Sequence, residues 1–209
     1  MKSWFVVGVA MVGMTGVAAA FPGIGGPKGA SAGDLDSFLN DATSANTLMT
    51  GAAWSMARAV LSDQEVKKLE DQRKALDNIK DPKERDAQVA ANNAAVTSAL
   101  SQIDYDAASK KIEGADAMKK EHLSSSIWNY SLALLKDTEL VARGAKLVSG
   151  VPDPAVATRV TRLKGFVDNM KSQIDSGKKM TGGIKKLQAA SGMKALPSSS
   201  SEKALATAD

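Results

Sequence analysis

Residues 34–61 read DLDSFLNDATSANTLMTGAAWSMARAVL, and this stretch decides the fold class. Its apolar side chains return with spacings that alternate between three and four residues: Leu35, Phe38, Ala42, Ala45, Met49, Ala52, Met56 and Ala59. A seam with this period lies along one side of an α-helix and is typical of helices that pack side by side. We therefore expect a long helix that is capped by Asp34 and ends near Leu61.

The segments that follow carry helix-start signals of their own. Ser62 and Glu65 have the spacing of a capping box, in which each side chain satisfies the backbone donor of the other. They predict a second helix that runs to about Lys80. Pro82 suits the first position of a third helix, which we expect to end near Ile103.

The most apolar part of the chain comes next. Residues 106–149 contain no proline, yet they are too many for one ordinary helix. We expect a break near Gly114 or at residues 124–126. Residues 123–148 then carry two adjacent apolar stripes, which is typical of a helix at the centre of a bundle.

The last seam follows the prolines at residues 151–154. It consists of Val160, Leu163, Val167, Met170 and Ile174. We expect this helix to end at Gly177, because Thr181-Gly182-Gly183 is unfavourable for a helix. Residues 197–209 are small and polar, and we expect them to be disordered.

Together these patterns predict an all-α fold, namely an elongated, mostly antiparallel bundle of five or six helices with coiled-coil-like seams. The bundle domain covers residues 34–177. Residues 21–33 form a flexible leader rich in glycine and proline, and residues 178–209 form a basic C-terminal segment with a disordered tail.

The first twenty residues have the three parts of a secretory signal peptide. Lys2 is followed by an uncharged apolar run from Phe5 to Ala19, and small residues precede a cleavage point after Ala20. The run is shorter than the roughly 20 residues that span a bilayer comfortably, so a cleaved signal is favoured over an uncleaved anchor. We expect the mature chain in the periplasm or outside a bacterial cell.

Composition limits the classes of function. The chain has no cysteine, so no disulfide stabilises it. Its 27 basic and 23 acidic side chains are nearly balanced, which does not favour a nucleic-acid partner. His122 is the single histidine, so zinc sites, di-iron sites and a Ser-His-Asp triad lack their usual residues. We expect no cofactor, no metal and no enzymatic activity.

Two groups of residues are candidates for interaction. Trp54 and Leu61 lie off the seam of the first helix, seven residues apart. We interpret them as contacts to another helix, and the alternative is an exposed site for a partner. The second group is the lysines of the C-terminal segment: Lys178, Lys179, Lys185 and Lys186. Here the alternatives are a solvated surface and a site for an anionic membrane or polymer.

The favoured function is therefore a non-enzymatic envelope protein, a scaffold, adaptor or chaperone-like module that binds another protein or itself. One alternative is a protein that associates with membranes or anionic polymers through its lysine-rich C-terminus. A second alternative is a carrier of a small ligand.

Overall fold

The computed structural model describes residues 32–149 and 157–206. The expected signal peptide (1–20), almost all of the leader (21–33) and the prolines at 151–154 lie outside these ranges. The described helices are α1 (Ala32–Val60), α2 (Asp63–Ala75), η1 (Leu76–Asn78), α3 (Pro82–Gln102), α4 (Tyr105–Glu113), α5 (Ala117–Ser149) and α6 (Ala157–Ser191). No strand occurs in the described ranges, and the predicted all-α bundle is confirmed.

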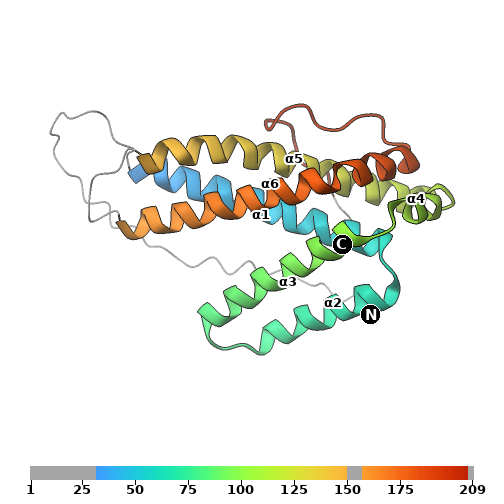
Figure 1. Ribbon diagram of the computed structural model, residues 1–209, viewed down its shortest axis with the longest axis horizontal. Coiled ribbons are helices and arrows are strands. Elements are labelled where there is room, and N and C mark those ends of the chain that lie inside the picture. The colour runs from blue at the N-terminus through green and yellow to red at the C-terminus, as the bar shows by residue number, and fades with distance from the viewer. Residues whose placement is uncertain (1–31, 150–156, 207–209) are drawn as a thin grey trace.

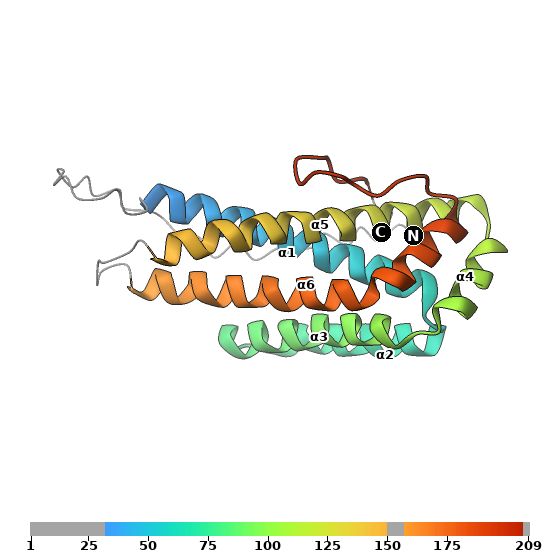
Figure 2. The ribbon, with the colours of Figure 1, turned by 45° about the horizontal axis from the view of Figure 1, so that its top comes forward.

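Three long helices form the body of the elongated molecule. α1, α5 and α6 lie side by side, and α5 runs antiparallel to the other two (Figures 1 and 2). The hairpin of α2, η1 and α3 packs on one side of this body, against α1 and α6, and α4 covers one end (Figure 2). None of the described helices has an apolar stretch long enough to cross a membrane.

The helix starts follow the predicted capping chemistry. The Ser62 hydroxyl accepts from Glu65 N–H, while the Ser62 N–H donates to the Glu65 carboxylate at 2.9 Å. Asp81 caps α3 by accepting a hydrogen bond from the Glu84 N–H at 2.9 Å, with Pro82 in the first turn. The expected break near Gly114 is confirmed, because α4 ends at Glu113 and α5 begins at Ala117. The first helix begins at Ala32, two residues before the expected cap at Asp34.

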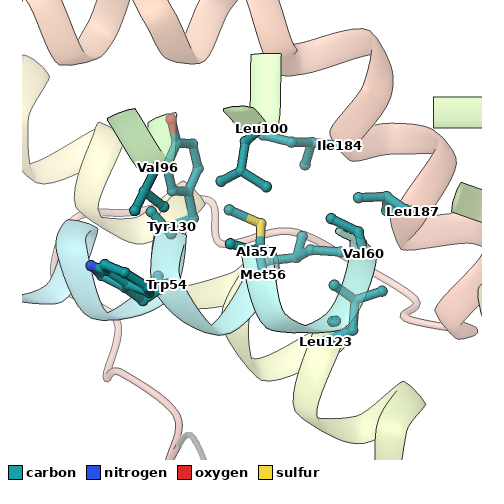
Figure 3. Close-up of a cluster of buried hydrophobic side chains, with 14 of the residues drawn as sticks. Trp54, Met56, Ala57, Val60, Val96, Leu100, Leu123, Tyr130, Ile184 and Leu187 are labelled. Atoms are coloured by element: carbon teal, nitrogen blue, oxygen red, sulfur yellow. The ribbon is translucent and has the colours of Figure 1, made fainter. Parts of the chain in front are cut away.

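The core consists of two clusters of buried side chains. The larger cluster joins α1, α2, α3, α4, α5 and α6, and its members include Ile112, Ile127 and Met180. Figure 3 shows part of it, with Trp54, Met56, Leu100, Leu123 and Tyr130 among the labelled side chains. The smaller cluster joins only α1, α5 and α6 and consists of Leu35, Phe38, Ala42, Ala45, Leu140, Leu163, Val167 and Met170. The predicted seam of the first helix therefore contributes to both clusters.

The last helix does not end at Gly177, as the sequence suggested, but continues to Ser191. Two of its glycines, Gly177 and Gly183, are places of close helix packing. A Cβ on Gly177 would lie 2.6 Å from a methyl carbon of Leu134, and a Cβ on Gly183 would lie 2.4 Å from the ring of Tyr105. The glycines that looked like helix breakers thus allow α5 and α4 to approach α6.

The C-terminal residues also differ from the expectation of a disordered tail. Residues 192–206 leave the end of α6 and lie along α5, on the side away from the α2–α3 hairpin (Figures 1 and 2). Pro197 is buried, and Met193 and Leu196 pack against the larger cluster. We call residues 192–206 the strap.

Candidate functional site

A groove of about 710 Å³ lies between α1, α3 and α6. The wall from α3 consists of short side chains, including Ala90, Asn93, Ala94, Thr97 and Ser98. Because these side chains are short, they leave space between α3 and the body of the bundle. The volume falls in the range of roughly 300–1,000 Å³ that is typical of ligand sites.

The lining of the groove is more apolar than polar, and its polar part carries little charge. Four side-chain amides line it, from Asn46, Asn93, Asn169 and Gln173, together with several serine and threonine hydroxyls. Among the lining residues whose side chains the structure describes, Lys179 alone is charged. Amides and hydroxyls both donate and accept hydrogen bonds, so the groove suits a neutral ligand with many polar groups.

One amide pair connects two walls of the groove. The Nε2 of Gln173 on α6 donates to the Oδ1 of Asn46 on α1 at 2.8 Å. The Oε1 of Gln173 is buried and has no hydrogen-bond partner in the part of the chain that the structure describes. An unpaired buried carbonyl costs about 1–3 kcal/mol, and this oxygen recovers that free energy if a small movement of the groove wall admits an N–H or O–H donor.

Two aromatic side chains of the larger cluster also line the groove. Trp54 comes from α1 and Tyr130 from α5, and Figure 3 shows both with Val96 of α3 in the same cluster. The Arg73 guanidinium carbon lies 5.4 Å from the centre of the Trp54 ring, which attaches α2 to this region. Burial raises the pKa of Tyr130, so its hydroxyl stays protonated and can act as a donor.

A buried carboxyl lies elsewhere on α5, outside the groove lining. Asp137 is 0% exposed, and neither of its oxygens has a hydrogen-bond partner within residues 32–149 and 157–206. Along α5 it stands between Ala133 of the larger cluster and Leu140 of the smaller cluster. Burial raises the pKa of Asp137 to about 7, because the charged form loses its hydration.

The titratable side chains of the groove lining that the structure describes are Lys179 and Tyr130. General acid–base or nucleophilic chemistry needs a titratable group or an activated nucleophile within reach of the substrate. Among its described residues, the lining contains no carboxylate, histidine or cysteine. Across the ranges 32–149 and 157–206, no three histidine, cysteine, aspartate or glutamate side chains gather as metal ligands would.

The structure places the first pair of candidate residues in the core. Trp54 is 5% exposed and Leu61 is 3% exposed, and both belong to the larger cluster. Both side chains therefore pack against other helices, and neither is exposed on the surface of the described chain. Trp54 still forms part of the groove wall.

The candidate lysines are all exposed on α6, but they do not form one free basic patch. Lys178 lies 3.6 Å from the Asp175 carboxylate, and Lys186 lies 2.6 Å from the Asp106 carboxylate. Lys179 faces the groove. Lys185 is exposed on the outer surface of the same helix.

Sequence reasoning missed the groove and the buried carboxyl. Asp137 had a usable signal, since it lies seven residues after Tyr130 in the apolar stripe of the central helix. Asn46 and Gln173 had no comparable signal in the sequence, because many other polar residues also lie beside an apolar seam. Comparisons with protein-family models, with curated proteins and with solved structures each find no match to this chain.

Proposed function

We propose that this chain is an exported, non-enzymatic helical-bundle protein of the bacterial envelope, and that it binds its partner in the groove between α1, α3 and α6. The groove carries the proposal. It combines a ligand-sized volume with a lining of apolar, amide and hydroxyl groups beside one described charge, that of Lys179. It also has one buried acceptor, Gln173 Oε1, with no partner among the described residues. Such a site recognises hydrogen-bonding groups without requiring charge.

The groove is tested by site-specific photocrosslinking in intact cells. A photoreactive amino acid at Ser98 lies in the groove wall, whereas one at the exposed Lys110 of α4 lies outside it. We expect a defined crosslinked species at Ser98 and none at Lys110. Filling the groove with Ala90→Trp should abolish that species, while the matched change Ala107→Trp on the surface of α4 should leave it. Equal crosslinking in all these variants contradicts the groove as the site.

Export is tested separately. We expect the chain purified from the periplasm or medium to begin at Phe21. If the protein keeps Met1 and stays in the cytoplasm, the proposed location in the envelope is wrong. The proposed binding in the groove is not affected by that result.

A carrier of a small ligand is the second candidate, and the groove volume favours it. Native mass spectrometry of the protein purified from its own cells distinguishes the two. A small molecule that is retained by the native chain and lost in Ala90→Trp supports a carrier. Association with membranes draws less support, because Lys178 and Lys186 have acidic neighbours.

A further inference from the structure

The strap is held on α5 by contacts to its main chain. Both polar atoms of the Asn129 side-chain amide form hydrogen bonds with the main chain of Leu205. Its Nδ2 donates to the Leu205 carbonyl at 2.8 Å, and its Oδ1 accepts from the Leu205 N–H at 2.8 Å. Asn129 is only 3% exposed, so this amide is committed to the strap. Any residue with a free N–H and carbonyl satisfies the same pair.

Two further side chains of α5 recognise the main chain in the same way. Trp128 Nε1 donates to the Lys203 carbonyl at 3.0 Å, and Lys136 Nζ donates to the Ser200 carbonyl at 2.6 Å. The strap side chains at two of these positions are turned to solvent, since Lys203 is exposed and Leu205 is 44% exposed. α5 therefore selects an extended backbone rather than particular side chains.

One side-chain contact sets the register. The Ser200 hydroxyl donates to the Glu139 carboxylate. Within the strap, Glu202 accepts from the N–H groups of Ser198 and Ser199 at 2.6 and 3.0 Å, which forms the turn that sends residues 203–205 back along α5. The bound segment is thus a short turn followed by residues 203–205, which have no regular secondary structure.

We propose that Trp128, Asn129, Lys136 and Glu139 form a peptide-binding site on α5, and that its ligand is the C-terminal segment of a second copy of this chain. In the single chain, the site is occupied by the strap of the same molecule. A strap from another molecule restores every contact, because all of them join α5 to residues 200–205. Exchange of an identical element between protomers has a low energetic cost.

The strap is also attached in a way that permits exchange. Gly192, at the end of α6, has φ 78°, which redirects the chain at that point. Met193, Leu196 and the buried Pro197 remain packed on their own molecule, so only the following residues need to move. Tethering gives the chain's own strap an effective concentration of the order of millimolar, so exchange becomes visible when that strap is weakened.

Two complementary variants of the full chain test the proposal. Leu205→Pro removes the N–H that donates to Asn129, so it weakens the binding of the chain's own strap while the site on α5 stays intact. Asn129→Ala damages the site and leaves an intact strap that is weakly held. Each variant alone should be monomeric by analytical ultracentrifugation, and their mixture should form a heterodimer. No heterodimer at concentrations up to millimolar overturns the proposal.

A labelled peptide of residues 197–206 provides the quantitative measurement. By fluorescence anisotropy, Leu205→Pro protein should bind it at least tenfold more tightly than native protein. The matched peptide with Lys203→Ala should bind equally well, whereas the peptide with Leu205→Pro should not bind. Two outcomes would contradict the site. One is that the peptide binds native and Leu205→Pro protein with equal affinity. The other is that it still binds the double variant Asn129→Ala with Leu205→Pro. Far-ultraviolet circular dichroism checks that the variants fold, since the strap contains no helix.

Discussion

Tyr105 of α4 lies against Gly183 of α6 so closely that a Cβ on Gly183 would come within 2.4 Å of its ring. The hydroxyl of Tyr105 donates to the Leu100 carbonyl at 2.8 Å, so the ring is also held by a hydrogen bond. α4 and the last turns of α6 are joined through this contact. A feature of the sequence that argued against a helix is therefore what allows that helix to pack.

This contact predicts opposite effects at two neighbouring glycines. Gly183→Ala should destabilise the protein by about 1–3 kcal/mol, because the methyl group forces the Tyr105 ring out of place. Gly182 has open space at its Cβ position. Gly182→Ala should therefore stabilise the protein by up to about 1 kcal/mol, through helix propensity alone. Thermal and urea unfolding of the two variants measure the difference, and similar values for both would contradict the close contact.

Asp137 predicts a dependence of stability on pH. Its pKa is about 7 in the folded chain, whereas an aspartate in an unfolded chain has a pKa of about 3.9. The folded state keeps the proton where the unfolded state has lost it, so the free energy of unfolding falls as pH rises from about 4 to 7 and then levels off. The two pKa values correspond to a loss of as much as about 4 kcal/mol at pH 8.

Asp137→Asn removes this titration and keeps the shape of the side chain. We expect urea unfolding between pH 5 and pH 8 to become nearly independent of pH in this variant. Asp71→Asn changes an exposed carboxylate of α2 and should keep the native dependence. Tyr130 does not contribute in this range, because burial raises its pKa further above neutrality. An unchanged slope in Asp137→Asn would show that the carboxyl reaches water.

A substitution at Gln173 should affect ligand binding in the groove without a large change in the stability of the fold. Gln173→Met loses one hydrogen bond to Asn46 but also removes a buried carbonyl oxygen without a partner. The two effects oppose each other, so the free energy of unfolding should change by less than about 1 kcal/mol. Crosslinking from Ser98 should nevertheless fall strongly, because the acceptor for the ligand is gone. A variant that crosslinks normally would show that Gln173 has only a structural role.

The capping box predicts a local effect on the hairpin. Ser62→Ala removes the acceptor for the Glu65 N–H and should cost about 1 kcal/mol. Hydrogen exchange should accelerate in the first turn of α2 and remain unchanged in α5. Asp63→Ala alters a neighbouring exposed residue and is the matched control. Uniform acceleration along the chain would indicate that α2 does not open independently of the bundle.

Local signals in the sequence predicted the helices well. The heptad seam from Leu35 to Ala59, the capping box at Ser62 and the break at Gly114 act through residues a few positions apart, so their consequences can be derived from spacing alone. The same reasoning was wrong at Gly177, where it predicted the end of the last helix. The sequence does not distinguish a glycine that ends a helix from one that makes room for a neighbouring helix.

The pattern of apolar side chains by itself determined that this chain forms helices with buried seams, since a period of three to four residues leaves no other way to hide them from water. Only the tertiary structure decided which polar residues meet. It brought Asn46 next to Gln173, buried Asp137 between two clusters and laid Leu205 on Asn129. These relationships join residues far apart in the chain, and hydrogen bonds and burial depend on distances in space that no local pattern specifies.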